Sequence, residues 1–277
     1  MNQLEYIPGI GGQSSVQMDG PTSFVGIAEN LRSREWSYNL GYRDIVSATR
    51  PAREIDTTFH ADYETADTLR RVADADVMAA TPGIFVAQQE WRQRGYILAS
   101  QPNDIHYGRL TTELKIALLD GAWWRLVSKS FIPTGEEPID GDDLDFPHDY
   151  EHDYGNPGSA PYVESSTLTP SDVRIIVYGP ATNPSIAVGG NTYQVNVTVP
   201  SGGYLIVDGR EKTITLILAN GTAQNAFPYG VRGSGQGSGT YIFEPLQPGS
   251  QEVTFSGDFG FDFGWYEEEG EPPWNQS

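Results

Sequence analysis

Alternating apolar and polar residues predict β-strands through most of the C-terminal half of the chain. Apolar residues take every second position from Tyr193 to Val199, which is the pattern of a strand with one buried face. Asp208-Gly209 stands between two β-rich runs, Tyr204–Val207 and Thr213–Leu218, and Asn220-Gly221 follows the second run. These dipeptides favour tight turns because glycine and asparagine tolerate positive φ. The sequence therefore predicts a series of hairpins.

The same pattern continues on both sides of these hairpins. Further strands are expected at Val173–Tyr178, Tyr241–Phe243 and Glu252–Phe255. A last strand places four aromatic residues on one face, namely Phe259, Phe261, Phe263 and Trp265. Several short strands separated by turn signals are typical of a β-sandwich or jelly roll. We expect such a module over residues 168–277.

The N-terminal half, residues 1–132, reads as strands interrupted by one helix. Arg34–Ala48 and Arg53–His60 are expected to be extended, with a bend at Arg50-Pro51 between them. Asp62 is the expected N-cap of a helix that runs to about Ala80. Its buried face is expected to hold Ala66, Leu69, Val72, Ala73 and Val77, and its solvated face Glu64, Asp67, Arg70, Arg71, Asp74 and Asp76.

Three more strands are expected after this helix. They cover Ile84–Trp91, Tyr96–Ser100 and Leu110–Leu119, and Asp120-Gly121 forms a turn after the last of them. The tryptophans of this half have two interpretations: they fill its core, or some of them anchor subunit contacts, where aromatic residues concentrate. These residues are Trp36, Trp91, Trp123 and Trp124.

Residues 133–167 differ in composition from both halves. They hold ten acidic residues and no lysine or arginine, within a chain whose formal net charge is −20. We expect a solvated linker or arm, whose tyrosines pack on a neighbour. An acidic chain repels phosphate backbones, so stable nucleic-acid binding is not expected. No apolar run reaches the length of a membrane span, and no secretory signal is visible.

Two groups in the acidic segment could suggest a metal site. His148, Glu151 and His152 match the H-x-x-E-H order of a class of zinc peptidases, but Pro147 and Gly155 oppose the helix that this chemistry needs. A cluster of acids could gather calcium, although its spacing does not fit an EF-hand loop. This cluster comprises Asp140, Asp142, Asp143, Asp145, Asp149 and Asp153. We expect neither site.

No other segment predicts catalysis or cofactor binding. The glycine-rich run GVRGSGQGSG fits no phosphate-binding motif and is expected to be a loop. The chain has no cysteine, and His60 and His106 have no sequence cue that pairs them with a nucleophile. Trp265 and Trp274 could stack on a sugar ring, which is an alternative use of the C-terminal module. We therefore expect no enzyme, no catalytic or metal residues and no cofactor.

The order of segments along the whole chain is similar to that of a known family. FPHDYEHDYG joins the two halves, and NPSI, SGGYLIVDGREKT and EPPW follow in that order in the C-terminal half. In this order they resemble the distal tail proteins, or Dit family, of long non-contractile-tailed bacteriophages. The resemblance implies a tail-tube-like β-sandwich or split barrel with one helix at 1–132, a linker at 133–167 and a galectin-like jelly roll at 168–277.

The resemblance also implies a structural role in the virion at the distal end of the phage tail. Members of this family, made in the host cytoplasm, form a hexameric ring that joins the tail tube to tail-tip or baseplate proteins. The ring is a platform for receptor-binding proteins in host attachment, and DNA crosses its lumen during ejection without specific binding. The expected partners are thus further copies of the chain, the tail tube protein, the tail-tip protein and receptor-binding proteins. The alternative function is a carbohydrate-binding adhesin that acts through the C-terminal module.

Overall fold

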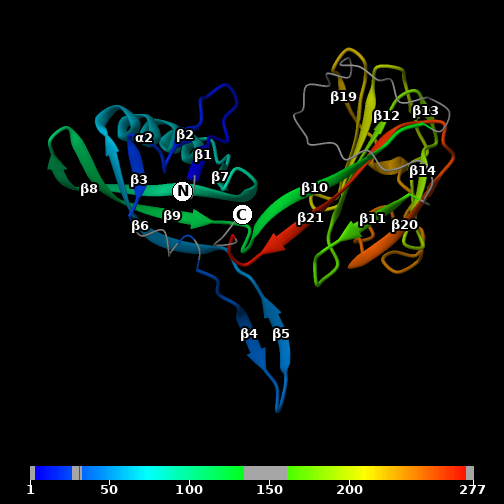
Figure 1. The fold of residues 1–277 in the computed structure, drawn as a ribbon, viewed down its shortest axis with the longest axis horizontal. Coiled ribbons are helices and arrows are strands. Elements are labelled where there is room, and N and C mark those ends of the chain that lie inside the picture. The colour runs from blue at the N-terminus through cyan, green and yellow to red at the C-terminus, as the bar shows by residue number, and fades with distance from the viewer. Residues whose placement is uncertain (1–3, 27–30, 32, 134–160, 273–277) are drawn as a thin grey trace. The chain divides into compact units, whose positions relative to one another are not determined.

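The computed structural model describes residues 4–26, 31, 33–133 and 161–272 (Figure 1). The chain divides into two compact units: unit 1 consists of Met1–Arg125 with Glu268–Ser277, and unit 2 of Leu126–Glu267. Each unit has its own hydrophobic core, and antiparallel strands make up most of both. The expected mainly β architecture with one α-helix beside the strands of the first unit is confirmed, while the segment borders at residues 132 and 167 stay predictions.

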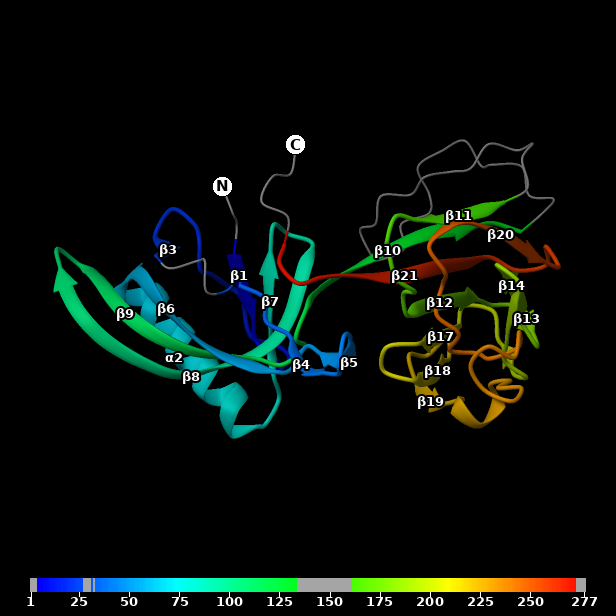
Figure 2. The same ribbon diagram turned by 90° about the horizontal axis from the view of Figure 1, so that it is seen from below.

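Unit 1 is a twisted antiparallel sheet covered by a helix. Its strands lie in the order β2-β1-β7-β8-β9-β6-β3. Alternate side chains of the long strands, such as Phe59 and Ile116, are buried on the face that helix α2 covers (Figures 1 and 2). The elements are β1 (Leu4–Ile7), β2 (Val16–Gln17), β3 (Ser23–Val25), β6 (Arg53–Asp62), α2 (Tyr63–Met78), β7 (Gly83–Ala87), β8 (Trp91–His106) and β9 (Arg109–Leu118).

The N-cap of helix α2 is the residue that the sequence predicts. Oδ1 of Asp62 accepts a hydrogen bond from the backbone N–H of Thr65 at 2.8 Å. Hydrogen bonding from the Thr65 side chain, and then from its backbone N–H, lowers the pKa of the Asp62 carboxyl below its usual range, because both stabilise the charged form. The helix ends at Met78, two residues earlier than the expected end near Ala80.

The two faces of the helix differ from the prediction in its last turn. Asp76 was expected on the solvated face but is completely buried, whereas Val77, expected inside, is 43% exposed. The carboxylate of Asp76 accepts hydrogen bonds from the Tyr6 hydroxyl and from the backbone N–H groups of Gly9 and Ile10. These three donors compensate for its loss of water, which is why an acidic residue can occupy the inner face.

The strands after the helix also differ in extent from the prediction. The expected strand Ile84–Trp91 is interrupted, because Gln88 and Gln89 adopt positive φ angles of 55° and 67° and turn the chain from β7 into β8. Strand β8 begins at Trp91 and is much longer than the expected Tyr96–Ser100. The expected turn at Asp120-Gly121 is present. The Asp120 carboxylate accepts bonds from the Arg94 side chain and backbone and from Trp124 Nε1.

Unit 2 is a sandwich of two antiparallel sheets. One sheet has the order β19-β18-β17-β12-β21-β10, and the other has the order β11-β20-β14-β15, with β13 and β16 paired separately. The expected β-sandwich is therefore confirmed. The strands are β10 (Trp123–Phe131), β11 (Tyr162–Ser165), β12 (Val173–Tyr178), β13 (Ala181–Thr182), β14 (Ser185–Val188), β15 (Asn191–Gln194), β16 (Thr198–Val199), β17 (Tyr204–Asp208), β18 (Thr213–Ile217), β19 (Ala223–Asn225), β20 (Gly249–Phe255) and β21 (Phe261–Glu269).

In unit 2, the alternation of apolar residues predicts which side chains are buried better than it predicts which segments pair as strands. Tyr193, Val195 and Val199 are buried as expected, but the run from 193 to 199 is split between β15, which pairs with β14, and β16, which pairs with β13. Ile242 and Phe243 are also buried, yet the expected strand at 241–243 is a loop, because no strand in the described part of the chain pairs with it. Burial needs only an apolar side chain, whereas a strand also needs a partner.

The two expected turns have different outcomes. At Asn220-Gly221, Gly221 adopts φ 81° as the turn requires. The connection after Asp208 is longer than a two-residue turn, because Asp208 pairs with Thr213 and residues 209–212 form the loop. Oδ1 of Asp208 accepts the N–H groups of residues 210 and 211 and so holds this longer loop.

Candidate assembly surface

Strands β4 (Ser37–Leu40) and β5 (Ile45–Thr49) form a hairpin that pairs with no other strand among the described residues. The sequence predicted a single extended segment over Arg34–Ala48. The chain instead reverses within it, and the Gly41 N–H donates to the Asp44 carbonyl at 2.9 Å. Figure 1 shows the hairpin projecting away from the sheet of unit 1. The single-strand prediction is therefore wrong for this segment, because the turn at 41–44 pairs its two halves.

The cross-strand register separates the side chains of the hairpin into two faces. Tyr38 is paired with Ala48, and Asn39 with Ser47, whose hydroxyl accepts a 2.9 Å bond from the Asn39 amide. Residues two positions apart share a face. The register shifts between Asn39 and Leu40, so that Leu40 is paired with Ile45. One face is therefore polar, with Ser37, Asn39, Ser47 and Thr49, and the other is apolar, with Trp36, Tyr38, Leu40, Ile45, Val46 and Ala48.

This apolar face has no cover within the described part of the chain. Every residue of β4 and β5 is exposed, and Leu40 and Val46 are each 70% exposed. Single exposed apolar residues are ordinary, but here they gather on one element that contributes to neither core. A two-stranded hairpin is at best marginally stable alone in water. The apolar face thus has the properties of a docking surface.

Two arginines lie beside the aromatic rings of the hairpin. The Arg50 guanidinium lies 4.5 Å from the centroid of the Trp36 ring, and that of Arg43 lies 5.1 Å from the Tyr42 ring. Such contacts are weakly attractive and orient the rings. They also give the apolar face a basic rim, in a chain with a formal net charge of −20.

Unit 1 has a second exposed apolar surface at the tip of β8 and β9. Ile105 and Tyr107 are exposed there, Tyr107 at 94%. Within the described ranges, the part of β8 after Gly95 is paired on one side only, by β9. Its other edge presents free backbone groups, which are a template for pairing with another chain. The hairpin and this tip are different surfaces of the same unit.

The described tryptophans differ in their burial. Trp91 and Trp123 are buried in the core of unit 1, whereas Trp36 lies on the hairpin and is 44% exposed, and Trp124 is half-buried. Trp265 is buried in the core of unit 2, so it cannot stack on a sugar. The other residue proposed for stacking, Trp274, lies outside the described residues.

The histidines and the candidate metal ligands do not form a common site in the described structure. His60 stacks on Phe24 and lies 3.0 Å from the Thr111 hydroxyl, whereas His106 contacts the Tyr107 ring. The motif His148, Glu151 and His152 and the acid cluster at 140–153 lie outside the described residues. Among the residues that are described, no group of three or more histidine or acidic side chains is placed to hold a metal.

The glycine-rich run at 230–239 is a loop, as predicted. Gly233, Gly235, Gly237 and Gly239 all have positive φ, so this loop needs glycine at alternate positions. The Gly237 N–H donates to the Glu244 carboxylate at 2.8 Å. A phosphate-binding loop needs backbone N–H groups that are free to bind the phosphate, whereas this N–H already binds an acidic side chain. No helix in the described ranges is long and apolar enough to cross a membrane.

Comparison of structures relates the fold to phage tail proteins. One similar structure is the Dit protein (gp 19.1) of phage SPP1, which is described as a paradigm of the hub adsorption apparatus of phages that infect Gram-positive bacteria. It superposes on this chain with a TM-score of 0.52 and 14% sequence identity, and the match covers 96% of this chain and 99% of the SPP1 protein. A chain of the phage P2 baseplate in its activated conformation with calcium gives 0.59 and 12%, over 98% and 100%. The same baseplate with strontium gives 0.57 and 12%, over the same shares of the two chains.

These neighbours match nearly the full length of the chain, so the likeness covers both units. No protein-family model matches the sequence, and a search of curated proteins returns no match. The chain therefore has the fold of a phage hub protein, the fold that the sequence resemblance predicts.

Proposed function

We propose that this chain is a non-enzymatic structural subunit of the tail tip of a long-tailed phage. Six copies form a ring that joins the tail tube protein to the tail-tip or baseplate proteins. The fold likeness to SPP1 Dit and to a P2 baseplate chain supports this role. The observation that carries the proposal is the β4–β5 hairpin, whose apolar face has no cover among the described residues.

A closed ring of identical subunits needs two different, complementary surfaces on each subunit. The hairpin supplies one of them, an apolar face around Leu40 and Val46 with a basic rim. The tip of β8 and β9 offers another, with exposed Ile105 and Tyr107 and a free strand edge. If the hairpin of one copy docks on unit 1 of the next copy, the hairpin face and the β8–β9 tip are both buried. Around a closed ring, each copy then has both surfaces covered by a neighbour.

The other partners follow from the same arrangement. The acidic balance of the chain repels DNA, which suits a lumen that the genome crosses without binding. Unit 2 has its own core and uses neither surface of unit 1, so it remains available as the platform for receptor-binding proteins. In this proposal the three segments at 1–132, 133–167 and 168–277 are the ring-forming domain, an arm and an outer domain.

The test compares substitutions on the two faces of the hairpin. Leu40→Asp places a charge on the apolar face, and Ser47→Asp places the same charge on the polar face, so the pair is matched. Mass photometry and negative-stain microscopy of the full chain, alone and with tail tube protein, measure the assembly. We expect rings of six for the wild type and for Ser47→Asp, and monomers for Leu40→Asp.

Circular dichroism distinguishes loss of assembly from loss of folding. Both substituted side chains lie on an exposed hairpin outside the two cores, so the spectrum of each variant is expected to match that of the wild type. A wild-type chain that stays monomeric at high concentration and with tail tube protein would disprove the ring. Rings formed equally well by Leu40→Asp would disprove the role of the hairpin.

A further inference from the structure

Unit 2 has an open groove on the outward face of the sheet that contains β14, β15 and β20. Alternation along these strands directs Ile186, Val188 and Val253 into the core. It directs Ala187 outward, between Thr192 of β15 and Thr254 of β20, which are its direct cross-strand neighbours. Because these outward side chains are small, they leave a hollow across the three strands.

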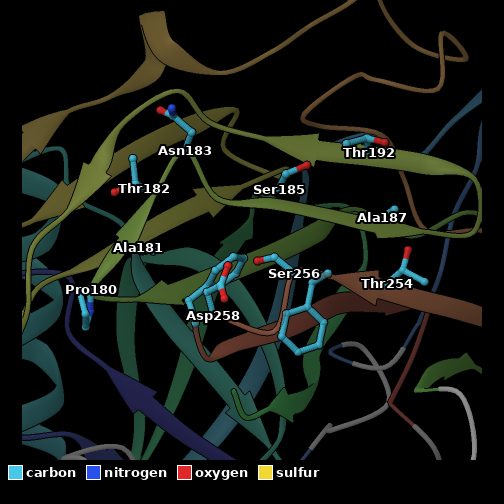
Figure 3. A pocket seen from close by; sticks show the side chains of 12 residues that line it. Pro180, Ala181, Thr182, Asn183, Ser185, Ala187, Thr192, Thr254, Ser256 and Asp258 are labelled. Atoms are coloured by element: carbon cyan, nitrogen blue, oxygen red, sulfur yellow. The ribbon is translucent and has the colours of Figure 1, made fainter. Parts of the chain in front are cut away.

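The groove is the size of a small-ligand site. Its volume is about 740 Å³, which lies within the range of roughly 300–1,000 Å³ that such sites occupy. One wall comes from the segment Pro180–Asn183, and the other from Ser256–Phe259 after β20. Figure 3 shows Asn183, Ser185 and Thr192 in one row and Asp258, Ser256 and Thr254 in a second row opposite them.

Polar and apolar side chains both line the groove, and the hydrogen-bonding groups of the polar ones are available. Seven of the lining residues are Thr182, Asn183, Ser185, Thr192, Thr254, Ser256 and Asp258. No side chain of these seven hydrogen-bonds to, or forms an ion pair with, another described residue. A surface of hydroxyl, amide and carboxylate groups can donate and accept hydrogen bonds at several points at once. This is the requirement for a ligand that is itself rich in hydroxyl groups.

The charge of the lining excludes several ligand classes. Among the described residues that line the groove, Asp258 is the one ionisable residue, and none of them is a lysine, arginine or histidine. A phosphate or carboxylate ligand would meet a negative charge without a compensating cation. Strand β14 is paired on both sides, so the floor has no free backbone edge on which a peptide strand could add. The ligand class that fits this lining is therefore a neutral molecule that side chains recognise.

The apolar part of the lining suits a sugar ring. Phe255 belongs to the lining only at its edge, because the alternation along β20 turns its ring toward the core, where it contacts Phe131, Phe259 and Phe261. Ala181 and Ala187 add further apolar surface. A pyranose presents hydroxyl groups at its edge and C–H groups on its faces, so it matches a lining of this mixed kind.

From this geometry we propose that the groove binds a short neutral oligosaccharide, with Asn183, Thr254 and Asp258 among its hydrogen-bonding groups. The site is new relative to the hub function and does not depend on ring formation. It also differs from a site at Trp265, which is buried.

An array of neutral and anionic bacterial glycans, probed with the full chain, tests this inference. We expect binding to neutral glycans above background and none to anionic ones. Ala187→Tyr fills the floor of the groove, and Ser250→Tyr places the same side chain on the exposed face of β20 outside it. Calorimetry with the best neutral glycan is expected to show at least tenfold weaker binding for Ala187→Tyr and an unchanged affinity for Ser250→Tyr.

Asp258→Asn provides a second variant in case Ala187→Tyr fails to fold. Its side chain is on an exposed loop, and we expect at least threefold weaker binding from the loss of a charged acceptor. The proposal is overturned by an array on which no neutral glycan binds, or by equal affinities in the wild type, Ala187→Tyr and Asp258→Asn. Capture of a tail protein that only Ala187→Tyr abolishes would assign the groove to a protein partner instead.

Discussion

The hydroxyl group of Tyr6 donates a 2.6 Å hydrogen bond to Oδ2 of Asp76, a residue 70 positions away in the sequence. Both residues are completely buried in unit 1. The same carboxylate accepts the N–H groups of Gly9 and Ile10 at 3.1 Å, so it joins the segment after β1 to the last turn of helix α2. The bond therefore connects two elements that local sequence does not relate.

Removal of this hydroxyl is expected to destabilise unit 1. Tyr6→Phe keeps the buried ring but leaves the Asp76 carboxylate with one donor fewer. We expect the free energy of unfolding to fall by about 1–3 kcal/mol, since a buried charged acceptor loses a partner. Urea denaturation monitored by tryptophan fluorescence measures the change. Tyr107→Phe is the control, because its ring is 94% exposed and its substitution should change stability by less than about 0.5 kcal/mol.

Stability is expected to fall at alkaline pH. Burial raises the pKa values of Tyr6, Tyr193 and Tyr266 above the ordinary value, and negative neighbours raise them further: Asp76 for Tyr6, Glu244 for Tyr193 and Asp208 for Tyr266. A tyrosine with a raised pKa in the folded state stabilises the folded protein, and this stabilisation is fully present when the pH is below the unfolded-state pKa of about 10. This contribution is lost as the pH rises above that value, by about 1.4 kcal/mol per pH unit for each tyrosine.

Urea titrations between pH 9 and pH 11.5 test this prediction. The wild type should lose stability progressively above pH 10, and Tyr6→Phe should do so with a smaller slope because one titrating group is absent. The same slope in both proteins would show that Tyr6 does not contribute to the alkaline transition.

Gly83, at the start of β7, leaves the space that the Tyr6 ring fills. A Cβ atom at this position would overlap with Cζ and the hydroxyl oxygen of Tyr6. We expect Gly83→Ala to lower the free energy of unfolding by about 1–3 kcal/mol, as overpacking does. Gly11→Ala is the matched control, since no atom lies within 4 Å of its added Cβ. Equal thermal midpoints for the two variants would contradict this account.

Hydrogen exchange should distinguish the hairpin from the cores. Its strands have few packing partners, so their amides are expected to exchange rapidly in the monomer. In the assembled ring the amides of β4 and β5 should become protected if the hairpin docks on a neighbour. Strand β12, which is paired on both sides, serves as the reference and should be protected in both states. Fast exchange of the hairpin in the ring would argue against docking.

The sequence predicts those elements whose signals are local. Asp62 is the N-cap of α2, Val173–Tyr178 is a strand, and Phe261, Phe263 and Trp265 share a buried face of β21, although Phe259 precedes this strand. Each depends on the chemistry of a few adjacent residues. For the candidate groove a weaker signal existed, namely the small polar residues that alternate with the apolar residues of β14 and β20. It could not show that the two strands lie side by side.

Asp76 shows how charge can be misleading. It lies seven positions after Leu69, so helical spacing places it on the inner face with Val72 and Ala73. Its charge led to the opposite prediction, because a buried acid is costly without partners. The three donors that make its burial tolerable come from residues 6–10, distant in sequence, and no local pattern indicates them.

The sequence by itself determined that the chain is mainly β, where its one long helix begins, and which apolar residues are buried in the C-terminal module. These properties follow from side-chain periodicity and capping chemistry over short windows. Only the tertiary structure decided that Asp76 is buried, that β4 and β5 form an exposed hairpin, and that Ala187 lies at the floor of a groove. The reason is physical: exposure, strand pairing and buried hydrogen bonds depend on which distant segments meet.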